Sequence, residues 1–147
     1  MQNSVQQTWF FHRPPGEVWD YLTKPELIEL WLMENDFKPV IGQKFQFIYR
    51  PAKEGAAPVY HYCQILEMVP HKLLSYSFRK GKSEKEYTLD SVVTWTLTGK
   101  NGGTELQLQH NGFTILKDVV EHNDGWNFLL NRLTERLKVA SNADANV

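Results

Sequence analysis

The chain has 147 residues, of which 41% are hydrophobic and 22% charged, the composition of one soluble globular domain with a real core. Sixteen basic and seventeen acidic side chains give a formal net charge of −1 and form no basic stripe, which argues against a nucleic-acid partner. A single cysteine, Cys63, excludes an intrachain disulfide, and no apolar run reaches the length of a membrane span.

Prolines divide the first part of the chain into a strand and two short helices. Residues 5–11 alternate loosely in polarity and stop at Pro14 and Pro15, which predicts a first strand. Pro15 suits the first turn of a helix, where its missing N–H costs nothing. A second short helix is expected over residues 24–31, with Thr23 as its N-cap and Pro25 in its first turn.

The middle of the chain, from about residue 43 to residue 112, reads as a run of β-strands. Large apolar side chains recur at every second position over 45–49, 74–78 and 93–97. Residues 59–69 are rich in residues that favour strands. Apolar residues occur at both odd and even positions, which leaves undecided which positions face inward. Residues 80–86 are charged and predict a solvated hairpin tip, and Asn101-Gly102-Gly103 predicts a tight turn before a last strand.

The longest periodic segment predicts a helix from Asp118 to about Ala140. Its apolar face recurs at steps of three or four and consists of Val119, His122, Trp126, Leu130, Leu133 and Leu137. Because such a stripe must be buried, the helix is expected to lie on the antiparallel sheet. We predict a single domain over residues 1–140 and a flexible tail over residues 141–147.

Several local signatures occur in a characteristic order along the chain. They are Pro15-Gly16-Glu17-Val18-Trp19, Lys24-Pro25-Glu26-Leu27 with Trp31, Ile65-Leu66-Glu67-Met68-Val69-Pro70, Val93-Thr94-Trp95, Gly103-Thr104-Glu105-Leu106, Leu108-Gln109-His110-Asn111-Gly112-Phe113 and His122-Asn123-Asp124-Gly125-Trp126. Together they resemble the SRPBCC (START-like) superfamily and, within it, the family of homologues of the activator of the 90-kDa heat-shock chaperone's ATPase.

The resemblance implies an α+β helix-grip fold, in which a curved antiparallel sheet of about six strands grips a long C-terminal helix and two short helices follow strand 1. It also places the His-x-x-Gly-Trp segment on the long helix. There, the missing side chain of Gly125 would allow the helix to approach the sheet or the short helices closely.

A curved sheet over a helix leaves room for a ligand, and aromatic residues reach 13% of the chain. We expect a small hydrophobic molecule, lipid-like or polycyclic aromatic, to bind in that space. The predicted lining residues are Phe45, Phe47, Tyr49, Tyr76, Phe78, Trp95 and His110 from the sheet, and Trp126, Leu129, Leu130 and Leu133 from the helix. The alternative is that the aromatic side chains fill the space themselves.

The candidate chemistry is sparse. His110 lies on the apolar parity of its strand and could act as an acid, a base or a donor, although a hydrogen-bonded structural histidine is the interpretation we favour. His61 and Cys63 share a strand face, but no further metal-ligand motif accompanies them, so we expect no metal and no cofactor. The absence of a catalytic motif favours ligand binding over an enzyme that acts on a hydrophobic substrate in the same cavity.

Location and partners follow from the same observations. Residues 1–11 lack the basic and apolar regions of a signal peptide, so we expect a cytoplasmic protein. The resemblance raises regulation of the chaperone's ATPase as a further function. The activators that stimulate the chaperone carry an additional N-terminal domain, so we expect no chaperone partner here. The sequence leaves the oligomeric state open.

Overall fold

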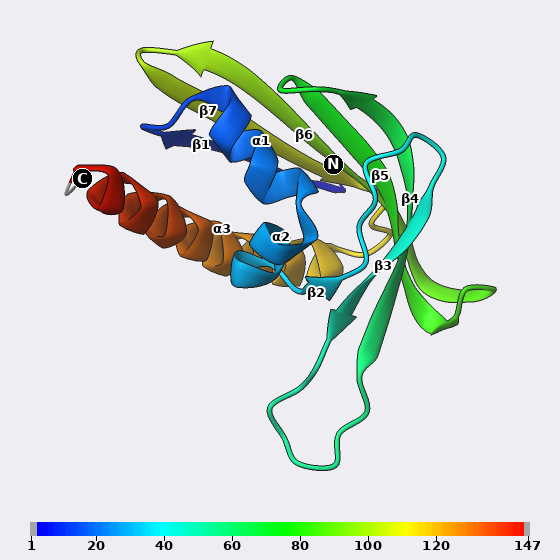
Figure 1. The fold of residues 1–147 in the computed structure, drawn as a ribbon. Coiled ribbons are helices and arrows are strands. Elements are labelled where there is room, and N and C mark those ends of the chain that lie inside the picture. Colours follow the sequence, from blue (N-terminus) through cyan, green and yellow to red (C-terminus); the bar gives the residue numbers. More distant parts are fainter. Residues whose placement is uncertain (1–2, 146–147) are drawn as a thin grey trace.

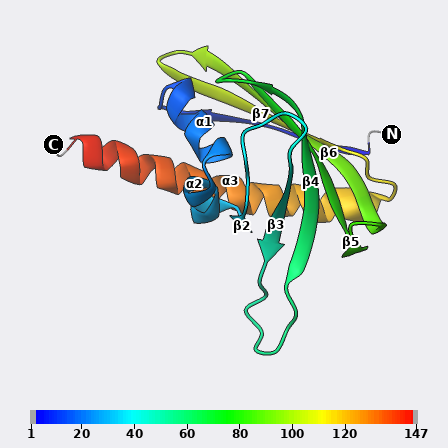
Figure 2. The ribbon, with the colours of Figure 1, turned by 45° about the vertical axis from the view of Figure 1, so that its right-hand side comes forward.

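The computed structural model describes the backbone of residues 3–145 and the side chains of residues 3–138. Its centre is an antiparallel sheet with the strand order β1-β7-β6-β5-β4-β3-β2, which curls around one side of helix α3 (Figures 1 and 2). The elements are β1 (Ser4–Phe11), α1 (Pro15–Thr23), α2 (Pro25–Trp31), β2 (Glu34–Asn35), β3 (Lys44–Tyr49), β4 (Val59–Val69), β5 (Leu73–Ser83), β6 (Glu86–Lys100), β7 (Gly103–Asn111) and α3 (Leu116–Ala145).

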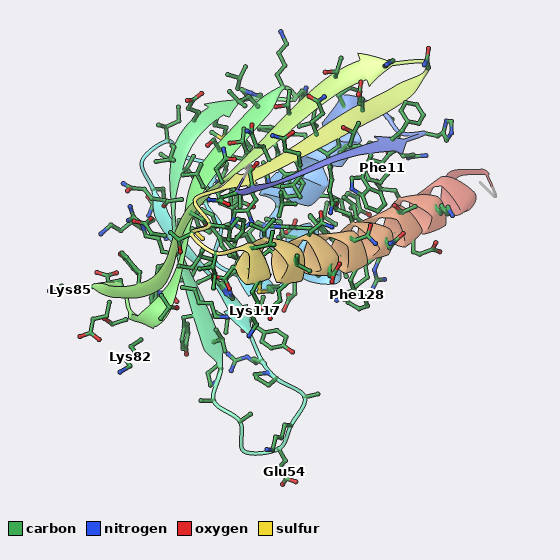
Figure 3. The ribbon with its side chains drawn as sticks, turned by 180° about the vertical axis from the view of Figure 1, so that it is seen from behind. Phe11, Glu54, Lys82, Lys85, Lys117 and Phe128 are labelled. Atoms are coloured by element: carbon green, nitrogen blue, oxygen red, sulfur yellow. The ribbon has the colours of Figure 1, made fainter. Side chains whose placement is uncertain are left out.

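This arrangement confirms the predicted helix-grip fold. The sheet has seven strands instead of about six because the two-residue β2 adds an edge beside β3. Helices α1 and α2 lie on the same side of the sheet as α3, with α1 in contact with β6 and β7 and α2 in contact with α3 (Figure 1). Glu54 marks the tip of the β3–β4 connection, which projects away from the rest of the chain (Figure 3).

The short helices begin at the predicted prolines. Pro15 and Pro25 each occupy the first turn of their helix, and Lys24 is at once the C-cap of α1 and the N-cap of α2. The prediction that Thr23 caps α2 was wrong. Its hydroxyl donates instead to the carbonyl of Trp19 at 2.8 Å, one turn back within α1, so Thr23 still belongs to the first helix.

The ambiguous segment 59–69 contains a β-bulge. The register of β4 on β5 shifts between Ile65 and Glu67, and this shift changes which parity faces inward. Before the bulge the inward residues are His61, Cys63 and Ile65, all buried, whereas Leu66 and Glu67 at the bulge are exposed. The bulge explains why the sequence is apolar on both parities.

The hairpins on either side of β6 follow their turn chemistry. Asn101 and Gly102 have φ angles of 52° and 76° and connect the paired residues Lys100 and Gly103, as a two-residue hairpin turn requires. At the other end the β5–β6 ladder continues to Ser83 and Glu86, further than predicted. The charged tip itself is exposed, as Lys82 and Lys85 show (Figure 3).

Helix α3 buries most of the predicted stripe on the concave face of the sheet, while Val119 and His122 at its start are half-buried. Trp126, Leu130, Leu133 and Leu137 are at most 4% exposed. The helix begins two residues before Asp118 and continues to Ala145, further than the predicted end at about Ala140. The predicted tail, residues 141–147, lies outside the described side chains, and its flexibility remains a prediction. Among the described residues, no helix combines the length and apolarity that crossing a membrane requires.

Candidate functional site

Large aromatic side chains pack against one another in the space between the sheet and α3. Trp95 of β6 lies edge-on to Trp31 of α2, with ring centroids 6.1 Å apart, and edge-on to Trp126 of α3, at 5.3 Å. Next to them, Phe45 contacts Tyr76 at 5.4 Å. Edge-to-face pairs at such spacings are favourable beyond the area they bury. These rings therefore form a packed core through the middle of the domain.

The polar edges of these rings are hydrogen-bonded, as buried indole N–H groups require. The indole N–H of Trp31 donates to the carbonyl of Tyr21 at 2.9 Å, and that of Trp95 donates to the hydroxyl of Tyr76 at 3.0 Å. Burial raises the pKa of the Tyr76 hydroxyl, so this group remains neutral. The aromatic core is thus specified by hydrogen bonds as well as by shape.

His110 of β7 is the centre of a hydrogen-bond chain that joins the sheet to α3. The indole N–H of Trp126 donates to Nδ1 of His110 at 2.9 Å, which assigns the ring proton to Nε2. Nε2 then donates to the hydroxyl of Ser91 at 2.8 Å, and Ser91 donates to the carbonyl of Phe78 at 2.6 Å. Three strands and the long helix are connected through this one imidazole.

The environment of His110 excludes it as an acid or base in its observed state. The side chain is fully buried, and both ring nitrogens are hydrogen-bonded. Desolvation, and then the neighbouring His122 and His61, lower the pKa of His110 to about 3. A proton added at Nδ1 would also oppose the N–H of Trp126. The structural role that we favoured from the sequence is the one the geometry supports.

The predicted lining residues divide into three groups. Seven are buried in or beside the aromatic core: Phe45, Phe47, Tyr76, Trp95, His110, Leu130 and Leu133. Tyr49 is 51% exposed, so its predicted inward position was wrong; it has the inward parity of β3 but is the last residue of the strand. Phe78, Trp126 and Leu129 border a pocket. Whether any of these residues contacts a ligand remains a prediction.

This pocket, which we call the His61 pocket, lies between the inner face of the sheet, the segment after α2 and one side of α3. It has a volume of about 170 Å³. Apolar cavities on the order of 150 Å³ accept a benzene-sized molecule. Its lining residues are Met33, His61, Phe78, Glu121, His122, Gly125, Trp126 and Leu129.

Gly125 forms part of the α3 wall of this pocket. A Cβ atom built on Gly125 would meet no atom within 4 Å. The expectation that this glycine allows α3 to approach the sheet or the short helices closely was therefore wrong. Glycine costs about 1 kcal/mol relative to alanine inside a helix. Here residue 125 is exposed and lines the pocket next to Trp126.

His61 of β4 supplies the most unusual polar atom of the pocket. Its ring stacks on Phe78, with centroids 4.8 Å apart and an interplanar angle of 28°. The side chain is 9% exposed, and Nδ1 is buried without a hydrogen-bond partner among the described residues. Desolvation, and then the charge of Lys80, lower the pKa of His61 to about 4, so the ring is neutral near pH 7.

His122 faces His61 and His110 from the helix. Its Nδ1 donates to the carbonyl of Asp118 at 2.8 Å, one turn back, and its ring lies 5.5 Å from that of His110. No local pattern brings His61, His110 and His122 together, because they lie on three different elements. The one local sign of the pocket is the glycine between His122 and Trp126, because a helix interior rarely benefits from glycine.

The neighbouring histidines do not form a metal site. Within the described part of the chain, no group of three or more His, Cys, Asp or Glu side chains could hold a metal ion. Cys63 lies on the same buried face of β4 as His61. Burial raises the pKa of its thiol well above the usual value, so Cys63 packs as a small apolar side chain.

Comparison with known proteins places this fold in a family. The model of the activator of Hsp90 ATPase homolog 1-like proteins matches residues 12–138. The chain belongs to this family. The resemblance drawn from the sequence is thereby confirmed over nearly the whole chain. Among curated proteins, none matches the sequence.

Solved structures of family-like proteins share the fold. Protein MLL2253 of Mesorhizobium loti is 32% identical, with a TM-score of 0.78, and the match covers 92% of this chain and 97% of that chain. CalU16 of Micromonospora echinospora is 25% identical, with a TM-score of 0.72, covering 91% of this chain and 75% of that one. The Aha1 dimer of Colwellia psychrerythraea is 15% identical, with a TM-score of 0.73, covering 91% of this chain and 95% of that one, and supports the fold alone.

Proposed function

We propose that this protein binds a small, largely apolar molecule with one aromatic ring in the His61 pocket. The proposal refines the sequence-based expectation of a lipid-like or polycyclic ligand. A volume of about 170 Å³ is below the roughly 300–1,000 Å³ of drug-sized sites. A single ring, or one ring of a larger molecule that extends into solvent, suits this volume.

The apolar lining of the pocket is the observation that carries this proposal. The pocket is walled by Met33, Phe78, Trp126 and Leu129, which provide thioether, aromatic and aliphatic contacts. The Trp126 indole is held by its hydrogen bond to His110, and the ring of Phe78 packs edge-on against the same imidazole. A rigid apolar wall with an unfilled helix position beside it is well suited to a flat ring.

The test compares wild type with Gly125→Leu. A panel of one-ring compounds (toluene, anisole, 4-methylphenol and indole) should raise the melting temperature of the wild type, because a ligand that binds only the folded state stabilises it. The leucine side chain would occupy the pocket and should weaken binding of the same compounds at least tenfold. Asn127→Leu, on the side of α3 away from the pocket, is the matched control and should bind like wild type.

Two results would contradict the proposal. One is that no compound of the panel changes the melting temperature or the NMR spectrum of the wild type. The other is that Gly125→Leu binds the panel as tightly as Asn127→Leu does. A folded Gly125→Leu protein with wild-type far-UV circular dichroism is required for the comparison, and the open space at residue 125 makes that outcome the expected one.

A further inference from the structure

A second and larger pocket lies further along α3, between the end of β1 and the C-terminal half of the helix. It has a volume of about 270 Å³. Its large apolar lining residues are Phe10, Phe11 and Leu137, and we call it the Phe11 pocket. Figure 3 shows Phe11 beside this half of α3. The Phe11 pocket shares no described lining residue with the His61 pocket, so a ligand could occupy it independently.

The sheet side of the Phe11 pocket is held in place because β1 packs closely on β7. A Cβ atom built on Gly103 would lie 2.3 Å from the carbonyl oxygen of Phe11, so this approach requires glycine. The hydroxyl of Thr104 donates to the carbonyl of Arg13 at 2.7 Å and holds the turn that follows β1. On the helix side, Leu137 is a buried core residue. The pocket is therefore largely preformed, as small-molecule sites usually are.

The ionisable side chains that line the Phe11 pocket are basic. They are His12, Arg13 and Lys138, and none of the described lining residues is Asp or Glu. The other polar side chain of the lining, Thr134, donates its hydroxyl to the carbonyl of Leu130 at 2.9 Å. The groups that could recognise the polar end of a ligand are therefore the basic ones.

The carboxylates next to these cations lie outside the lining of the pocket. Arg13 pairs with Glu17, and its side chain is only 15% exposed, so this cation stays in its pair. Lys138 lies 3.5 Å from Glu135, and both side chains are largely exposed. Because exposed ion pairs of this kind contribute little to stability, Lys138 can turn to an incoming anion at low cost.

We propose that the Phe11 pocket is a second binding site, which takes the apolar part of an amphipathic carboxylate and places the carboxylate beside Lys138. An apolar cavity on the order of 150 Å³ holds one benzene ring. The larger volume of the Phe11 pocket leaves room for an alkyl chain, or for a ring with a side chain. Burial of the apolar part provides the affinity, and the basic side chains select the charge of the polar end.

The experiment compares three probes that carry the same chain, which are octanoate, octan-1-ol and octyltrimethylammonium. Dissociation constants are measured by NMR titration at concentrations below those at which the probes aggregate. Thr134→Phe places a large side chain in the pocket, and Asn131→Phe, at an exposed position of α3 that lines neither pocket, is its matched control. Lys138→Gln removes the exposed charge, and Lys82→Gln removes an equal charge at the β5–β6 hairpin tip (Figure 3).

We expect wild type to bind octanoate more tightly than octan-1-ol, and octan-1-ol more tightly than octyltrimethylammonium. Thr134→Phe should weaken octanoate binding at least about fivefold, because the chain loses its buried surface. Lys138→Gln should weaken it about threefold with little effect on octan-1-ol, the size of one exposed charge pair. Both control variants should bind like wild type. Gly125→Leu, which fills the His61 pocket, should also bind octanoate like wild type.

The inference is overturned if octanoate fails to bind wild type or binds it no more tightly than octyltrimethylammonium does. Equal octanoate binding by Thr134→Phe and Asn131→Phe would also overturn it. Loss of octanoate binding in Gly125→Leu would place the probe in the His61 pocket and reject the second site. If Thr134→Phe does not fold, the two glutamine variants decide, because equal octanoate binding by Lys138→Gln and Lys82→Gln would contradict the proposal.

Discussion

The ring of Phe78 contacts two buried histidines that differ in whether their ring nitrogens are hydrogen-bonded. His110 lies edge-on to it, with centroids 5.3 Å apart, and uses both ring nitrogens. His61 stacks on it and has a nitrogen without a partner among the described residues. The same residue type therefore contributes to stability at one position and costs stability at the other.

Replacing each histidine by phenylalanine should change stability in opposite directions. His61→Phe removes an unsatisfied buried nitrogen and should raise the free energy of unfolding by about 1 kcal/mol. His110→Phe leaves the indole N–H of Trp126 unpaired in the core and should lower it by about 1–3 kcal/mol. Urea unfolding at pH 7 measures both values. A destabilised His61→Phe with an unaffected His110→Phe would reverse our assignment of the two roles.

At the residue scale, periodicity predicts which way a side chain points better than it predicts what surrounds that side chain. The alternation at Phe45 and Phe47 identified two core residues, but the same parity placed Tyr49 inward, although it lies where the strand leaves the cover of the helices. Parity also cannot separate a ring that fills the interior from one that borders a pocket. That distinction depends on the distance between sheet and helix, which no local pattern encodes.

At the scale of elements, helix α2 is attached to α3 through its last turn. The side chains of Arg132 and Arg136 both donate to the carbonyl of Leu30, at 3.3 and 3.2 Å. Carbonyls at a helix C-terminus lack partners within the helix, and positive charge is favourable there. The two arginines therefore hold the end of α2, and with it Met33, beside the His61 pocket.

Removing this attachment should loosen α2 more than the rest of the domain. In the double variant Arg132→Ala/Arg136→Ala, amide hydrogen exchange should accelerate in residues 25–33 and stay unchanged in β5 and β6, because local opening requires less free energy than global unfolding. The expected loss of global stability is small, about 1 kcal/mol, since both hydrogen bonds are exposed. Uniform acceleration across the sheet would argue against a local attachment.

Helix α3 should become more stable when Gly125 is replaced by alanine. The added Cβ meets no atom within 4 Å, and the helix gains the propensity difference of about 0.5–1 kcal/mol. Thermal unfolding of Gly125→Ala should therefore show a higher midpoint than that of wild type. A lower midpoint would show that the space beside residue 125 is occupied in solution.

The boundaries of helices and strands were predictable where a local sequence rule sets them. They were not predictable where pairing between distant segments sets them. The prolines at 15 and 25 and the turn at Asn101-Gly102 set boundaries that the structure reproduces. The bulge between Ile65 and Glu67 appeared in the sequence only as an apolar pattern on both parities. The β5–β6 ladder extends into a charged segment because backbone pairing, which side-chain charge does not prevent, continues to Ser83 and Glu86.

At the scale of the whole molecule, the core couples the sheet and α3 through uncharged imidazoles. Desolvation lowers the pKa of both buried rings, and the effect is increased at His61 by Lys80 and His122 and at His110 by His122 and His61. Neither can be protonated without desolvating a positive charge among aromatic rings. The stability of the complete domain is therefore linked to these two titrations.

The domain should lose stability on acidification from neutral pH, well above the range in which carboxylates titrate. The folded pKa values, about 4 for His61 and about 3 for His110, lie below the ordinary value of 6.5. Between these limits the unfolded chain binds protons that the folded chain does not, so stability is constant above pH 7 and falls below about pH 6.5. At pH 5 each histidine should have lowered the free energy of unfolding by about 2 kcal/mol, at 1.36 kcal/mol per pKa unit. Urea unfolding should thus show a loss of about 4 kcal/mol from pH 7 to pH 5 in wild type and about half of that in His61→Phe, whereas equal stability of wild type at both pH values would mean that the two imidazoles are not buried as neutral groups.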